Sequence, residues 1–127
     1  MTIAEYLDSI KERLLTDPIV ASFQIARDRT TSVDAHLRAR LVLVDGGQLE
    51  FSEYVQRSGG QIEVVTYSYH WADAENGLIR RWDNAPHYPD LSGFPHHVHH
   101  GATGEVTPGK PMNIFAVLDE MAKADEL

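Results

Sequence analysis

The stretch HLRARLVLVDGGQLEFSEYVQR, residues 36–57, contains two β-rich runs separated by Asp45-Gly46-Gly47. An aspartate followed by glycine is a strong signal for the tight turn of a β-hairpin. In the first run apolar and polar residues alternate, which is the period of a strand with one buried face. The apolar set is Leu37, Ala39, Leu41 and Leu43, and the polar set is His36, Arg38 and Arg40. These residues predict an antiparallel hairpin with one half-buried face.

The segments on either side continue this pattern. Residues 20–32, VASFQIARDRTTS, are typical of a strand, and their polar second half places that strand at the edge of a sheet. Ser58-Gly59-Gly60 predicts a turn before the run QIEVVTYSYHWAD, and Asn76-Gly77 turns that run back into LIRRWDN. Because consecutive strands joined by short turns pair with their neighbours, the chain predicts an antiparallel meander of about five strands.

Helices are predicted near both ends of the chain. Thr2 and Glu5 have the spacing of a capping box, and the apolar residues after them recur at helical intervals, which predicts a helix over about Ile3 to Leu15. Towards the other end, Pro111 suits a first helical turn, and a second apolar stripe follows it. The members of this stripe are Ile114, Phe115, Leu118 and Met121.

The predicted fold class is therefore α+β, as a single domain over residues 1–127. An antiparallel sheet is flanked by an N-terminal and a C-terminal helix, which should cover one face of the sheet while the other face could remain open. Residues 84–109, rich in proline, glycine and histidine, are expected to form a long structured loop before the last helix. Long ordered loops in small domains are more often functional than idle.

Composition excludes several classes of protein. The 127 residues include no cysteine, so disulfides and thiolate metal sites are excluded. The formal net charge is −8, whereas a general nucleic-acid binder gains affinity from an excess of lysine and arginine. Any nucleic-acid role must therefore use a local basic patch or a partner. The start of the chain has no long apolar run, so we expect neither a signal peptide nor a membrane span, and we expect a cytoplasmic location.

Five of the seven histidines lie within fourteen positions: His87, His96, His97, His99 and His100. One interpretation is a site for zinc or another divalent metal. His97 and His99 form an H-x-H pair, which on an extended segment places both imidazoles on one side. His87 or Asp83 could complete a zinc-like site. H-x-H alone is a weak signal, so no cofactor is favoured on this pattern.

A second interpretation is proton transfer in a ribonuclease that needs no metal, since such an enzyme requires a base, an acid and a cation beside the phosphate. The catalytic candidates are His97, His99, His96, His87 and Asp83. Arg80 and Arg81, at the end of the last strand, are candidates for holding phosphate. Tyr69 and Trp71 are candidate stacking surfaces for RNA bases, although cross-strand packing is the more frequent use of such aromatic residues.

A third interpretation is structural. The loop would fold back on the sheet, with its histidines hydrogen-bonded to the backbone or to Asp83 and Asp90, as small polar loops commonly are.

The block YSYHWADAENGLIRRWDNAPHYPDLSGFPHHVHHG, residues 67–101, resembles the signature of the TumE family of prokaryotic toxin–antitoxin proteins. The shared features fall at Tyr69-His70-Trp71, Asp73, Leu78-Ile79-Arg80, Asp83-Asn84-Ala85-Pro86-His87, and Phe94-Pro95-His96-His97 with His99. Two positions depart from the pattern. Tyr88 stands where a second histidine is often found, and Val98 stands where a polar or basic residue is expected, which puts any role for these two positions in doubt.

The resemblance implies the toxin half of a two-gene module, neutralised by a cognate antitoxin that is often a small DNA-binding protein. Our first hypothesis adds an inference from the residues: the toxin acts on RNA as a metal-independent endoribonuclease. His97 or His99 would be base and acid, Arg80 the phosphate contact, and Asp83 the group that orients a histidine.

The rival hypothesis is a non-catalytic interaction protein whose histidine-rich loop is structural or binds a divalent metal. The acidic net charge fits a basic antitoxin surface better than free binding to RNA. An exposed edge in the first strand would permit a homodimer formed by strand addition.

Overall fold

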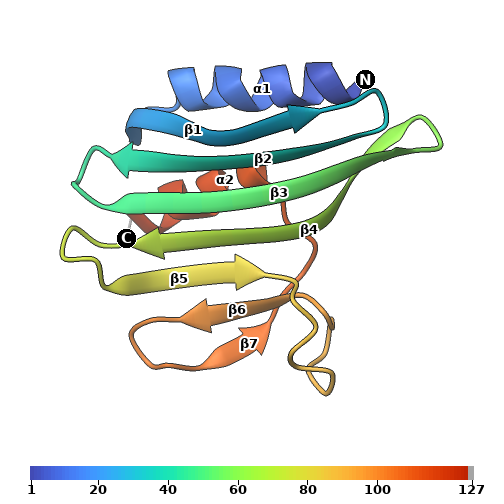
Figure 1. Ribbon diagram of the computed structural model, residues 1–127. Helices are drawn as coiled ribbons and strands as arrows, with labels where there is room; N and C mark the ends of the chain where they lie inside the picture. Colours follow the sequence, from blue (N-terminus) through green and yellow to red (C-terminus); the bar gives the residue numbers. More distant parts are fainter. Residues whose placement is uncertain (126–127) are drawn as a thin grey trace.

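The structure, a computed structural model, describes residues 1–125 and has an α+β fold (Figure 1). The elements are α1 (Ile3–Thr16), β1 (Val20–Thr30), β2 (Asp34–Leu43), β3 (Gln48–Ser58), β4 (Gln61–Ala72), β5 (Leu78–Asp83), β6 (His97–His100), β7 (Val106–Pro108) and α2 (Ile114–Asp125). All seven strands form one antiparallel sheet in the order β1 to β7. The predicted fold class and both predicted helices are confirmed, and β1 lies at an edge of the sheet as expected.

The sequence predicted about five strands, and the structure has seven over the described residues. The two missed strands, β6 and β7, lie inside residues 84–109, which the sequence pattern indicated as a loop. They are short, β6 is mostly histidine, β7 has three residues and ends in proline, and glycine stands nearby, so neither is an apolar run long enough to signal a strand. The extended conformation of β6 depends on its pairing with β5, which is a tertiary contact, and β7 pairs in turn with β6. The histidine-rich stretch is thus partly an added strand.

The predicted hairpin of residues 36–57 is present, with one buried face. Leu41 pairs with Leu49 and Ala39 pairs with Phe51, so the apolar residues of both strands share one face. Gly46, in the turn, has a φ of 88°, a backbone conformation that glycine adopts without strain.

Both helices pack on that apolar face, with α2 behind the strands in the view of Figure 1. The capping box of α1 is present, with Glu5 N–H donating to Thr2 Oγ1 at 3.1 Å and Thr2 N–H donating to Glu5 Oε1 at 2.9 Å. The buried stripe of α1 consists of Ile3, Tyr6, Leu7, Ile10 and Leu14. This stripe and the apolar side of α2 form one core with the sheet.

Over residues 1–125, no helix covers the opposite face of the sheet, which is called the open face. Its side chains alternate with the core residues and fall into cross-strand rows. One row holds Arg40, Glu50, His70, Arg81 and His99, and the next holds Arg27, Arg38, Ser52, Ser68, Asp83 and His97. Among the described residues, no helix combines the length and apolarity that spanning a membrane requires.

Candidate functional site

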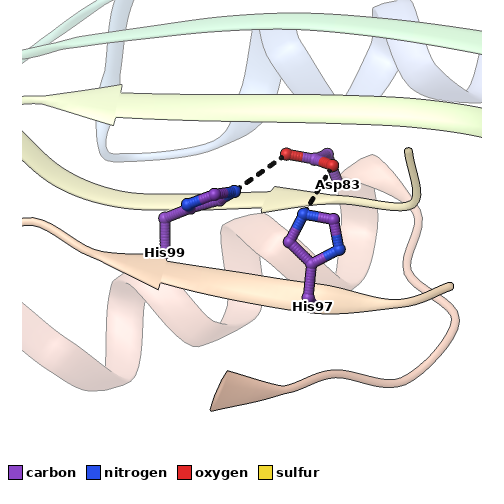
Figure 2. A group of neighbouring side chains, drawn as sticks. All are labelled: Asp83, His97 and His99. Carbon is purple, nitrogen blue, oxygen red and sulfur yellow. Dashed lines mark ion pairs between the residues drawn. The ribbon is translucent and has the colours of Figure 1, made fainter. Parts of the chain in front are cut away.

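The pairing of β6 with β5 brings together the titratable and charged side chains of the candidate site. In this register Arg81 lies opposite His99 and Asp83 lies opposite His97. Because strand side chains alternate, all four point to the open face. Asp83, His97 and His99 are called the Asp83 group, and Figure 2 shows their side chains directed at one another from the two strands.

The Asp83 carboxylate is buried and contacted on both oxygens. Oδ1 lies 2.9 Å from His97 Nε2 and accepts a hydrogen bond from the Ala85 N–H at 3.1 Å. Oδ2 lies 3.4 Å from His99 Nε2 and accepts a hydrogen bond from Arg81 Nε at 3.0 Å. The carboxylate therefore contacts both histidines and the guanidinium group of Arg81.

His97 is held in a single orientation. Its Nδ1 donates to the Pro95 carbonyl at 2.9 Å, which fixes a hydrogen on that nitrogen because a carbonyl can only accept. Its Nε2 is buried and close to Asp83 Oδ1, but it has no aligned hydrogen bond. In a neutral ring the lone pair of Nε2 would face a carboxylate oxygen. The contact is favourable only with a cation between the two atoms, either a proton or a metal ion.

His99 is the more accessible histidine of the Asp83 group, with 28% of its side chain exposed. Its Nε2 faces Asp83, and Figure 2 shows the other ring nitrogen pointing away from that carboxylate. Burial lowers the pKa of His99, the charges of His97 and Arg81 lower it further, and Asp83 opposes them. The imidazole is therefore unprotonated at neutral pH, with Nδ1 free to accept a proton when Nε2 carries the hydrogen.

Tyr88 covers one side of the two histidines. Its ring lies edge-on to His97, with centroids 4.9 Å apart, and edge-on to His99 at 6.0 Å. Its departure from the family pattern made a role at this position doubtful, but the structure places it directly against the site.

His70, on β4, flanks Arg81 on the side away from His99. Its Nδ1 lies 3.5 Å from Arg81 Nη1, and the two residues are register partners. Sequence reasoning did not select His70. The alternation of Tyr69 and Trp71 with His70 was a usable signal, because it places His70 on the polar face.

Two adjoining hollows lie on the open face and share Ser52, Ser68 and Arg81. One, of about 380 Å³, extends to Asp83 and Asn84. The other, of about 340 Å³, extends to a further set of side chains, Arg38, Glu50, Phe51 and His70. Arg81 therefore lies where the two hollows adjoin.

Arg80 is not brought to the Asp83 group. Its side chain lies on the opposite face of β5. There the guanidinium carbon lies 5.6 Å from the Trp82 ring centroid, and Nη1 lies 3.9 Å from Glu120 Oε2. Tyr69 and Trp71 lie in the core, 0% and 5% exposed, so they offer no stacking surface to a base. In each case the reason is that successive side chains of a strand point to opposite faces, which places Arg80, Tyr69 and Trp71 on the face away from Asp83.

His96 and His87 also lie outside the group. The His96 ring stacks on Tyr67, with Nδ1 2.7 Å from the tyrosine hydroxyl, on the face opposite His97. Burial lowers the pKa of His96, and the charge of His97 adds to this effect. His87 is exposed, between β5 and β6. The three residues whose ligand atoms lie within 4.8 Å of one another are Asp83, His97 and His99, so Asp83 occupies the place considered for His87.

These features define a small α+β protein in which one sheet face is packed by helices and the other presents an aspartate–histidine group beside an arginine. Residues 10–126 match the family model described as toxin TumE, so the chain belongs to the TumE toxin family. The predicted resemblance is confirmed, and membership implies a toxin role and, with it, an antitoxin partner. No curated protein and no solved structure matches the chain.

Proposed function

We propose that this TumE toxin is an endoribonuclease that needs no metal, with His99, Arg81 and His70 acting on the scissile phosphate. The observation that carries the proposal is the row in which Arg81 stands between the two histidines on the open face. By strand spacing, the Cα atoms of His70 and His99 lie about 10 Å apart, so a phosphate bound by Arg81 would have an imidazole on either side.

The chemistry follows from these positions. His99 Nδ1 takes the proton of the ribose 2′-hydroxyl while O2′ forms a bond to phosphorus. The bond from phosphorus to O5′ breaks, and the protonated form of His70 supplies the proton to the leaving oxygen. Arg81 donates to the non-bridging oxygens, where negative charge increases in the transition state. The products are a 2′,3′-cyclic phosphate and a 5′-hydroxyl.

In this scheme the other two members of the Asp83 group position the reacting residues. Asp83 holds Nε2 of His99 and Nε of Arg81, which sets the ring orientation and the direction of the guanidinium. His97 has 1% of its side chain exposed, so it acts on Asp83 and not on the substrate.

The test is RNA cleavage by the purified protein in the presence of a chelator, with analysis of the new ends. We expect His99→Ala and Arg81→Ala to lower the cleavage rate on the order of 100-fold or more. Arg80→Ala is the matched control, since it removes the same charge one residue away on the other face. Folding is checked by circular dichroism. A folded His99→Ala variant with full activity, or equal losses for Arg80→Ala and Arg81→Ala, would sink the proposal.

A second candidate function is binding of a divalent metal by the Asp83 group in a non-catalytic interaction protein. The unaligned, buried His97 Nε2 favours it, as does the backbone carbonyl on the other ring nitrogen, an arrangement common for metal-bound histidine. The separations of 2.9 Å and 3.4 Å suit ligand atoms that share one ion, because bonds of about 2.1 Å at tetrahedral or octahedral angles give about 3.0–3.4 Å.

Elemental analysis of protein purified without a tag separates the two candidates. The endoribonuclease proposal predicts no stoichiometric metal and cleavage that persists in chelator. The second candidate predicts one zinc or similar ion per chain, lost in His97→Asn, with unchanged binding of metal in His87→Asn.

A further inference from the structure

Nearly half of the lysines and arginines of this acidic chain lie on the open face. Of eleven lysines and arginines, five lie in three adjacent cross-strand rows of that face: Arg27, Arg29, Arg38, Arg40 and Arg81. The first row contains Arg40 and Arg81, and the second contains Arg27 and Arg38. The third row holds Arg29, His36, Tyr54 and Thr66. The same rows hold two acidic residues, Glu50 and Asp83. These three rows therefore carry a net positive charge although the chain has a formal charge of −8.

These cations are close to one another. Arg27 lies directly opposite Arg38 on the neighbouring strand, and Arg29 lies opposite His36. Burial lowers the pKa of His36, and the charges of the three nearby arginines lower it further, which agrees with this crowding. Like charges placed opposite each other in a sheet are destabilising. Folding stability therefore gives no reason for this arrangement.

Neutralisation within the chain is incomplete. Glu50 lies 3.2 Å from Arg38 and 3.6 Å from Arg40, so one carboxylate serves two guanidinium groups. Over residues 1–125, Arg27 and Arg29 form no salt bridge. Such a set of unneutralised arginines matches a polyanion.

The basic rows are continuous with the reaction centre. The hollow that contains Arg38 and His70 shares three lining residues with the hollow that contains Asp83. From β1 to β6 the face extends about 24 Å by strand spacing, which is room for several nucleotides. Across β1–β6 the side chains of the three rows are all polar or ionisable, whereas the centre of a stable protein interface is enriched in apolar and aromatic side chains.

We propose that single-stranded RNA lies across the open face, from the Asp83 group to β1, with Arg27, Arg29, Arg38 and Arg40 holding its phosphates. This inference rests on the proposed endoribonuclease function for the cut itself. The position of Arg81 at the shared part of the two hollows places the scissile phosphate at one end of the track. The remaining phosphates then extend over the arginines of β2 and β1.

The test measures binding of a short fluorescein-labelled single-stranded RNA by anisotropy, in a His99→Ala background that leaves the RNA uncut. We expect Arg38→Gln combined with Arg40→Gln to weaken binding about tenfold at low salt, and to reduce the slope of log K against log salt by about 0.7 for each arginine removed. The matched control is Arg57→Gln combined with Lys123→Gln, which removes the same charge outside the three rows. It should leave both quantities nearly unchanged.

The outcomes separate the two proposals. Equal weakening by both pairs, or no RNA binding at low salt, would overturn the RNA track. So would a loss of antitoxin binding in the Arg38 and Arg40 pair while RNA binding stays intact, because the face would then be a protein interface. If the expected binding pattern is found but the wild-type chain cuts no RNA, the track stands and the endoribonuclease proposal falls.

Discussion

At the scale of single residues, Glu53 is the main departure from an apolar core. It is 1% exposed, between the sheet and both helices. Its Oε1 accepts from the Tyr6 hydroxyl at 2.6 Å, and Oε2 accepts from the Tyr69 hydroxyl at 2.8 Å and the Ile114 N–H at 2.7 Å. One carboxyl group thus connects α1, β4 and the start of α2. Burial nevertheless raises the pKa of Glu53, with the three hydrogen bonds opposing the effect.

Removing this carboxyl group should lower the free energy of unfolding of the protein. Glu53→Ala leaves three buried donors without an acceptor and opens a cavity, so we expect a loss of about 3 kcal/mol in the free energy of unfolding. Glu53→Gln keeps the shape and one acceptor oxygen and should lose about 1 kcal/mol at low pH. Urea unfolding followed by tryptophan fluorescence measures both. A Glu53→Ala variant as stable as wild type would show that the three hydrogen bonds contribute nothing net.

The same residue gives a pH dependence. Because the pKa is raised on folding, the native state binds the proton more tightly than the unfolded chain. The associated stability is complete below the unfolded value of 4.5 and is lost as pH rises through the raised folded pKa. Wild type should therefore lose stability relative to Glu53→Gln as the pH rises above 4.5. A difference that is constant over this range would contradict the raised pKa.

The residue scale also shows what a sequence pattern leaves open. Two adjacent arginines, Arg80 and Arg81, were both phosphate candidates, and Arg80 was preferred for the contact. They point to opposite faces, and only Arg81 touches Asp83. Alternation along a strand was known from the sequence. Which of the two faces would hold the histidines was not, because that depends on the register of β6.

At the scale of elements, β6 decides the geometry of the site. It is four residues long and positions His97 and His99 through its pairing with β5. At its end, Gly101 N–H donates to the Ile79 carbonyl at 3.0 Å. A Cβ on Gly101 would lie 1.6 Å from the Leu78 carbonyl oxygen, a distance no packing allows. Only glycine lets the end of β6 come this close to β5.

Gly101→Ala should therefore move β6 away from β5. We expect a loss of about 2 kcal/mol or more in unfolding free energy, and a loss of RNA cleavage under conditions where the variant is still folded, since His99 and Arg81 are separated. The control is Gly104→Ala, which has open space but a φ of 74°. It should lose about 1 kcal/mol from backbone strain and keep its activity. If both variants behave alike, the close approach of Gly101 does not determine the site.

The elements were predictable where local signals were strong. The hairpin of β2 and β3, the capping box of α1 and the stripe of α2 follow from alternation, turn glycines and helical spacing. The two short strands after residue 84 have no such signal, since β6 is extended through its pairing with β5 and β7 through its pairing with β6.

At the scale of the whole molecule, net charge and charge distribution lead to different expectations. The formal charge of −8 indicated a basic partner, whereas the register of five strands gathers arginines on the open face. The net charge is a single number for the whole chain, so it does not show on which face of the sheet the charged side chains lie.

The sequence by itself determined the α+β class, the two helices, the meander through β5 and the membership suggested by the block at residues 67–101. It also determined that histidine, aspartate and arginine would be near one another along the chain. Tertiary structure alone decided that the histidine stretch becomes a strand, that Asp83 joins His97 and His99, and that His70 flanks Arg81. The physical reason is that periodicity is a local property of the chain, whereas register between strands is fixed by packing across the whole sheet.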